Sequence, residues 1–257
     1  MKKILFLAII LIPALTNAKT KEVKLFNGKN LKNWEIFIGP SAIQPKEPIF
    51  SVVKLDGENL LRITGEVFAS LATKKEYENY HIRMVFRWGE KVFIKKNSGL
   101  LYHSYGPFGV GIGVWMSAHE FQLCTGKMGD SFCMGNSYFE IPAVKDAEGK
   151  TFRYDPEGVK SQFGVGFPAK SCAKEADHEK PAGEWNVVDL YCFGQNSVHV
   201  VNGVVNMMNY NSGSIDKDGK VLPLSKGKIQ IQSEGGELYV KSITLEKIDG
   251  IPGGLIK

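Results

Sequence analysis

Apolar and polar residues alternate one by one along much of this chain. The alternation is clearest over residues 80–88, where the apolar members are Tyr80, Ile82, Met84, Phe86 and Trp88. The same period returns at residues 120–123, 188–192 and 229–232. Successive side chains of a β-strand point to opposite faces, so this period indicates strands with one buried face. No long stretch has a helical period, and the 28 glycines fall largely between the strand candidates. The pattern predicts an all-β protein, a two-sheet antiparallel β-sandwich.

Two local signals refine this prediction. Asn202-Gly203 separates the apolar runs 198–201 and 204–208, which is typical of a hairpin whose two turn residues both need positive φ. Near the end of the chain, apolar residues change parity around Lys241, which indicates a β-bulge there. The change lies between Leu238 and Val240 on one parity and Ile243 and Leu245 on the other.

Two segments break the strand rhythm. Residues 106–114 are rich in glycine, and residues 140–181 are polar and contain four prolines. We expect both to be irregular, and irregular insertions of such length are usually functional or mobile covers.

The first residues resemble a secretory signal peptide. Lys2 and Lys3 precede an apolar run from Ile4 to Leu15, and small residues follow up to Ala18. The run is shorter than the roughly 20 residues that span a bilayer, so we expect no integral membrane span. Residues 1–18 are therefore expected to be removed, leaving residues 19–257 as a single periplasmic or secreted domain.

Charge and cysteine content narrow the function only slightly. The net charge of +5 falls to near +3 without Lys2 and Lys3, which does not suggest a nucleic-acid partner. Export permits disulfides among the four cysteines, but their spacing does not choose among the three possible pairings. No CxxC pair is present, which argues against a structural zinc site.

Six blocks of sequence, in order, carry a family resemblance. They are residues 25–34 (LFNGKNLKNW), 97–103 (NSGLLYH), 120–123 (EFQL), 181–186 (PAGEWN), 198–203 (VHVVNG) and 227–236 (GKIQIQSEGG). Together they resemble the 3-keto-disaccharide hydrolase family over nearly the whole chain after residue 18. The resemblance implies a concanavalin- or laminin-G-like jelly roll that acts on sugars whose C3 hydroxyl has become a ketone. It also implies a carbohydrate partner, an oxidised disaccharide or glycoside.

That chemistry requires particular groups. A 3-keto group acidifies the proton on C2, and its removal gives an enolate that can expel the glycosidic oxygen from C1. The route needs a base near C2, an electrophile near the C3 oxygen and an acid for the leaving group. A divalent metal could be the electrophile.

Candidate site residues come from the family blocks. We predict His103, Glu120 and Glu234 as catalytic residues, with His103 and Glu120 also able to hold a metal. Gln122 lies two residues after Glu120 and so shares its face, and Gln232 bears the same relation to Glu234. The predicted substrate-binding residues are Gln122, Gln232, Arg83 and Arg87.

The resemblance also implies a disulfide pairing. Cys172 and Cys192 resemble cysteines that flank the 181–186 block in relatives, so we predict that they pair. Cys124 would then pair with Cys133 and close a short loop.

Departures from the family pattern keep a second function open. Where close relatives tend to read IQEGDMGD, this chain has LCTGKMGD, with Cys124, Thr125 and Lys127 in place of acidic and amide residues. Asn97 stands where an acid is frequent, and Val85 where a glutamate often occurs. The first reading is a hydrolase or lyase for 3-keto-glycosides, and the second is a non-catalytic carbohydrate-binding β-sandwich.

Overall fold

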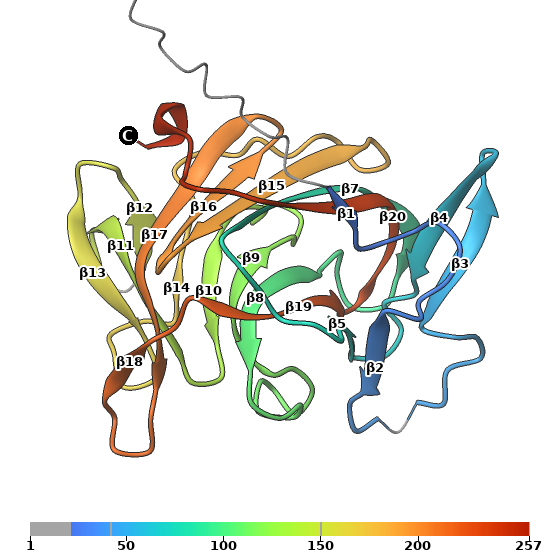
Figure 1. The fold of residues 1–257 in the computed structure, drawn as a ribbon, viewed down its shortest axis with the longest axis horizontal. Coiled ribbons are helices and arrows are strands. Elements are labelled where there is room, and N and C mark those ends of the chain that lie inside the picture. The colour runs from blue at the N-terminus through green and yellow to red at the C-terminus, as the bar shows by residue number, and fades with distance from the viewer. Residues whose placement is uncertain (1–21, 42, 150, 257) are drawn as a thin grey trace, which may run out of the picture.

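The computed structural model describes residues 22–41, 43–149 and 151–256. Its strands form two antiparallel sheets packed face to face, as the alternation predicts. In Figure 1, β7 and β20 of one sheet run above β8, β19 and β5 of the other. The signal peptide predicted for residues 1–18 lies outside the described residues. None of the helical segments in the described ranges has the length and apolar character needed to cross a membrane.

The large sheet contains twelve strands within the described residues. Their order is β12 (Phe152–Tyr154), β11 (Ser137–Lys145), β17 (Val204–Ile215), β16 (Asn196–Val201), β15 (Asn186–Phe193), β7 (Tyr80–Val92), β20 (Gly236–Lys247), β4 (Glu58–Ile63) and β3 (Phe50–Leu55). Three short strands join this path: β1 (Val23–Lys24) on β20, β13 (Val159–Gly164) on β11 and β18 (Val221–Pro223) on β17.

The small sheet contains eight strands, counted over the same residues. Their order is β14 (Ser171–Cys172), β10 (Ser131–Met134), β9 (Ser117–Gln122), β8 (Gly99–Tyr105), β19 (Lys226–Ser233), β5 (Ala69–Thr73) and β2 (Trp34–Ile38), with β6 (Tyr77–Glu78) on β19. A single 3-10 turn, η1 (Gly253–Leu255), is present near the end of the described chain.

The main core lies between the two sheets. The five apolar residues of the 80–88 alternation are all within it, each at most 3% exposed. Phe121 and Leu100 enter the same cluster from the small sheet. Side chains that alternate with these residues point away from the core, so each sheet also has an outer face, and the outer face of the small sheet carries the candidate site.

The bulge predicted near Lys241 is confirmed. The pairing of β20 with β7 shifts register between Val240 and Ser242, so residues on both sides of the shift reach the core. The extra residue reverses the parity and lets Ile243 follow Val240 into the same cluster.

The predicted hairpin is also confirmed. Val201 pairs with Val204, and the two residues between them have positive φ, 49° at Asn202 and 88° at Gly203. The Asn202 amide donates to the carbonyl of His178 (2.7 Å), which attaches the turn to the preceding loop.

We expect Gly203→Val to destabilise the protein by about 1–2 kcal/mol, because a β-branched residue resists positive φ. Thermal unfolding of the variant and the parent protein measures the effect. Gly203→Asn is the matched control, since asparagine tolerates this region of φ. Equal melting temperatures for the valine variant and the parent would contradict the strain argument.

The prediction that residues 140–181 are irregular is wrong. The segment contains most of β11 and all of β12, β13 and β14. Phe152, Tyr154 and Phe163 are buried in a second core cluster beside the main one. These strands are short and separated by prolines and turns, which hides their period in the sequence.

The predicted disulfides are not present, because all four cysteines are buried free thiols. Cys192 lies in the main core cluster and Cys172 in the second one, so the two do not share a contact region. Cys133 faces the second cluster, whereas Cys124 follows β9 in the loop beside Lys95. Both predicted pairs, Cys172–Cys192 and Cys124–Cys133, are therefore corrected.

We expect the folded protein to react slowly with a thiol reagent such as DTNB. Burial raises the pKa of the Cys133, Cys172 and Cys192 thiols, so little thiolate forms at neutral pH. Denaturation without reductant should release four thiols per chain. A count of two or zero reactive thiols in the denatured chain would show that disulfides form.

Candidate functional site

The candidate site lies on the outer face of the small sheet, around Gly99 of β8. Gly99 pairs with Gln122 of β9, and Leu100 pairs with Ile231 of β19, so Gln232 lies on the other side of Gly99. A Cβ atom on Gly99 would collide with the Oε1 atoms of Gln232 and Glu120. The glycine therefore leaves space in which side chains from both neighbouring strands meet.

The polar atoms of this cluster are buried without partners. The Oε1 atoms of Glu120 and Gln122, the Oδ1 of Asn97, and both amide atoms of Gln232 have no hydrogen-bond partner among the described residues. Glu120 is 2% exposed and Gln232 is fully buried. Because a buried polar group without a hydrogen bond costs about 1–3 kcal/mol, such a concentration indicates a place where a polar ligand or water completes the bonding.

Two carboxyl groups in this region have raised pKa values. Burial raises the pKa of Glu120 well above its usual value, and the charge of Glu234 raises it further. Burial also raises the pKa of Glu234, to about 7, against an opposing effect of Lys95. Buried carboxyl groups with elevated pKa values are typical of acid–base sites.

His103 does not join this cluster. Its ring lies between the sheets, 6.2 Å from the ring of Tyr80 and 5.9 Å from that of His119, and it is fully buried. Glu120 alternates with His119 on β9 and points to the opposite face. The predicted catalytic pair of His103 and Glu120 is therefore wrong, because the small sheet separates the two side chains.

A bulge explains the error. Pairing between β8 and β9 shifts register between Tyr102 and Tyr105, and His103 adopts a positive φ of 49°. Simple alternation from Leu101 would place His103 on the outer face with Glu120, but the bulge turns its ring inward. There, burial lowers the pKa of His103 well below its usual value, and neither ring nitrogen has a hydrogen-bond partner among the described residues.

Arg83 and Arg87 also lie away from the cluster around Gly99. Both lie on the outer face of the large sheet, because they alternate with the buried residues of β7. Arg83 donates to Asp189 (2.7 Å), and Arg87 donates to Asp56 (2.8 Å) while its guanidinium lies over the Trp185 ring. They form ion pairs on the sheet opposite the site, so the prediction that they bind the same substrate as Glu120 is wrong.

The predicted metal ligands do not fit a single ion. His103 and Glu120 face opposite sides of the small sheet, and no group of three or more His, Cys, Asp or Glu side chains in the described residues is arranged to hold a metal.

Two members of the site were not predicted from sequence. Gly99 provides the space and Asn97 adds an unpartnered amide oxygen. Both belong to the 97–103 family block. The family block therefore identified the correct strand, although the residue predicted from it, His103, is not part of the site.

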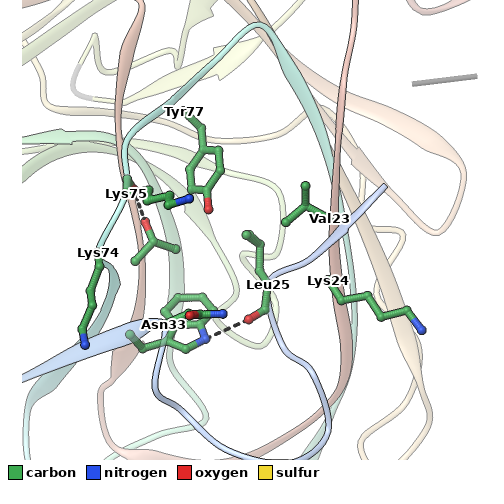
Figure 2. A pocket seen from close by; sticks show the side chains of 9 residues that line it. Val23, Lys24, Leu25, Asn33, Lys74, Lys75 and Tyr77 are labelled. Atoms are coloured by element: carbon green, nitrogen blue, oxygen red, sulfur yellow. Dashed lines mark hydrogen bonds between the residues drawn. The ribbon is translucent and has the colours of Figure 1, made fainter. Parts of the chain in front are cut away.

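A separate cavity of about 230 Å³ lies at the edge of the sandwich, away from Glu120. The first family block contributes Leu25, Asn33 and Trp34 to its lining, and the Trp34 ring nitrogen donates to the carbonyl of Leu25 (3.0 Å). Figure 2 shows the Lys75 ammonium beside the Tyr77 ring, whereas the side chains of Lys24 and Lys74 point outward. This first block thus builds a sheet edge, and the site residues come from the later blocks.

Solved structures with the same fold include a candidate glycosyl hydrolase and a protein with a galectin-like fold. The chain is 21% identical to a candidate glycosyl hydrolase from Parabacteroides distasonis ATCC 8503, with 89% of this chain and 94% of that one covered and a TM-score of 0.51. A Bacillus subtilis protein of unknown function with a galectin-like fold is 13% identical, with 88% and 94% covered and a TM-score of 0.51. Comparison with curated proteins finds no match.

The fold is a jelly roll, and the family match suggests a glycosidase-like or carbohydrate-binding protein. Within that class the family can be named. The chain belongs to the family of the 3-keto-alpha-glucoside-1,2-lyase-like domain, whose model matches residues 21–246.

Proposed function

We propose that this protein cleaves the glycosidic bond of 3-keto-glycosides, as a hydrolase or lyase. The observation that carries the proposal is the cluster of unpartnered polar atoms around Gly99, which belong to Glu120, Gln122, Gln232 and Asn97. Sugars offer many hydroxyl groups, so they can complete several such bonds at once. Family membership supports the choice of an oxidised sugar.

The two carboxyl groups suit the two proton transfers. With a pKa of about 7, Glu234 is partly ionised at neutral pH and is proposed as the base that removes the C2 proton. Electrons from that C–H bond form the enolate and then expel the C1 oxygen. Glu120, whose pKa burial raises well above its usual value, is proposed to be protonated and to give its proton to the leaving oxygen. Water then adds to the enone, with hydroxyl to C1 and hydrogen to C2.

The amides have a complementary role. Nε2 of Gln232 is a buried N–H donor without a partner among the described residues, and we assign it to the oxyanion that develops on C3. Gln122 and Asn97 contribute acceptor oxygens for the remaining sugar hydroxyls.

A carbohydrate-binding module is the second candidate. The near-complete burial of Glu120 favours it, because so little of that carboxyl group is accessible for proton transfer to a substrate. The substitutions at Cys124, Thr125 and Lys127 also favour it, since they remove acidic and amide groups next to the site.

Incubation with a panel of 3-keto-disaccharides and 3-keto-glucosides tests the proposal, with released sugar as the readout. Parallel samples with EDTA or with added Mg²⁺, Mn²⁺ or Zn²⁺ test whether release depends on a divalent metal. The enzyme proposal requires release from at least one substrate. Binding measured by calorimetry without release would instead identify a binding module.

We also propose that the protein acts in the periplasm or outside the cell. The signal-peptide pattern of residues 1–18 supports this location. Fractionation of cells that express the full chain, followed by N-terminal sequencing, tests it.

A further inference from the structure

An apolar pocket of about 280 Å³ lies at the end of the small sheet, beside the candidate site. Four loop segments form it, at residues 40–41 with 43, 66–68, 94 and 112–114. Its apolar lining comprises Pro40, Ile43, Val67, Phe68, Ile94, Ile112 and Val114. Glu66 is the only charged residue in the described lining, so the pocket provides mainly apolar contact surface.

Two hydrogen bonds join this pocket to the turn that carries Glu234. The Ser233 hydroxyl donates to the carbonyl of Val67 (2.7 Å), and the Ile94 amide donates to the carbonyl of Gly235 (3.2 Å). The residues before and after Glu234 are therefore bonded to two lining residues of the pocket. If the reacting bond of a ligand lies near Glu234, the leaving group of that ligand can reach this pocket.

The rim of the pocket exposes three large aliphatic side chains. Ile94 is 72% exposed, Ile112 is 64% exposed and Ile43 is 53% exposed. Ile112 also has a φ of 49°, a conformation that a β-branched residue rarely adopts. Strained residues of this kind persist when the surrounding structure enforces them, and they concentrate at ligand sites.

We infer that the pocket binds an apolar aglycone, so that the substrate is a glycoside of a hydrophobic ring compound. The inference rests on the proposed function. A volume of about 280 Å³ is at the lower end of small-molecule sites and suits one ring system. A second sugar would bring hydroxyl groups to a surface with few partners for them. The flat side of a protein partner would leave the pocket unfilled.

The test compares 3-keto-glucosides of 2-naphthol and of methanol. Ile112→Asn removes one aliphatic side chain of the rim, and asparagine tolerates positive φ, so the variant should fold. We expect the ratio of kcat/KM for the naphthyl over the methyl substrate to fall about tenfold, as expected for the loss of one largely buried aliphatic contact. Val159→Asn is the control, because Val159 is 79% exposed on β13 of the large sheet. An unchanged ratio in Ile112→Asn overturns the inference.

A binding measurement separates this inference from the proposed function. If no 3-keto-glucoside is cleaved, the proposed function fails, but the pocket can still be tested with 2-naphthyl β-glucoside by fluorescence titration. Binding by the parent protein that weakens about tenfold in Ile112→Asn supports an aglycone pocket. The absence of binding to the parent overturns it. Light scattering completes the test, because a parent dimer that Ile112→Asn converts to a monomer would show that a second copy covers the rim.

Discussion

Glu120→Gln is expected to lower turnover of 3-keto-glycosides at least about 100-fold, in the range expected when a general acid or base is lost. Glutamine has nearly the same shape but cannot give a proton to the leaving oxygen. The measurement is kcat for the best substrate of the panel, with circular dichroism to confirm the fold. Glu157→Gln, the same acid-to-amide change at an exposed position in the turn before β13 of the large sheet, is the matched control and should leave turnover unchanged.

The same variant should also change the dependence of stability on pH. Because burial raises the pKa of Glu120 in the folded state, the folded protein holds a proton that the unfolded chain releases above about pH 4.5. The free energy of unfolding therefore decreases as pH rises from that value through the folded pKa. Glutamine does not titrate, so the melting temperature of Glu120→Gln relative to that of the parent should increase between pH 5 and pH 8. A constant difference would mean that Glu120 is not the buried carboxyl group described above.

Gly65→Ala should have the largest effect on stability, a loss of about 3 kcal/mol from backbone strain and overpacking combined. Gly65 has a φ of 75°, and a Cβ atom there would collide with the backbone of Gly236. Its carbonyl also accepts a hydrogen bond from the Gly235 amide (2.8 Å). The melting temperature should fall by roughly 6–12 °C for a domain of this size.

Gly57→Ala is the matched control for this prediction. Gly57 has a similar φ of 80°, but a Cβ atom there would meet no atom within 4 Å. The control should therefore lose only about 1 kcal/mol, from the conformational strain alone. Equal losses in the two variants would show that the contact with Gly236 contributes nothing. Turnover should fall in Gly65→Ala alone, because the displaced strand end lies next to Glu234.

Local periodicity was sufficient for much of this protein. Alternation along β7 identified the buried face, and the change of parity around Lys241 identified the bulge in β20. The turn was predictable from its residue types, because Asn202 and Gly203 both tolerate the positive φ that they adopt in the structure. Glu120 and Gln122 share a face for the same reason, since two residues complete one period of a strand. Each of these features depends on neighbours a few residues apart, so the sequence contains the information.

Only the tertiary structure decided which strand faces come together to form the site. The bulge at His103 turns its ring into the core, although a regular strand would place it beside Glu120. Arg83 and Arg87 lie on the outer face of the other sheet, a relation that no spacing within β7 reveals. The cysteines remain apart because Cys192 and Cys172 enter different core clusters. Distances between segments far apart in sequence depend on how the sheets pair and pack, whereas alternation specifies only the two sides of each strand.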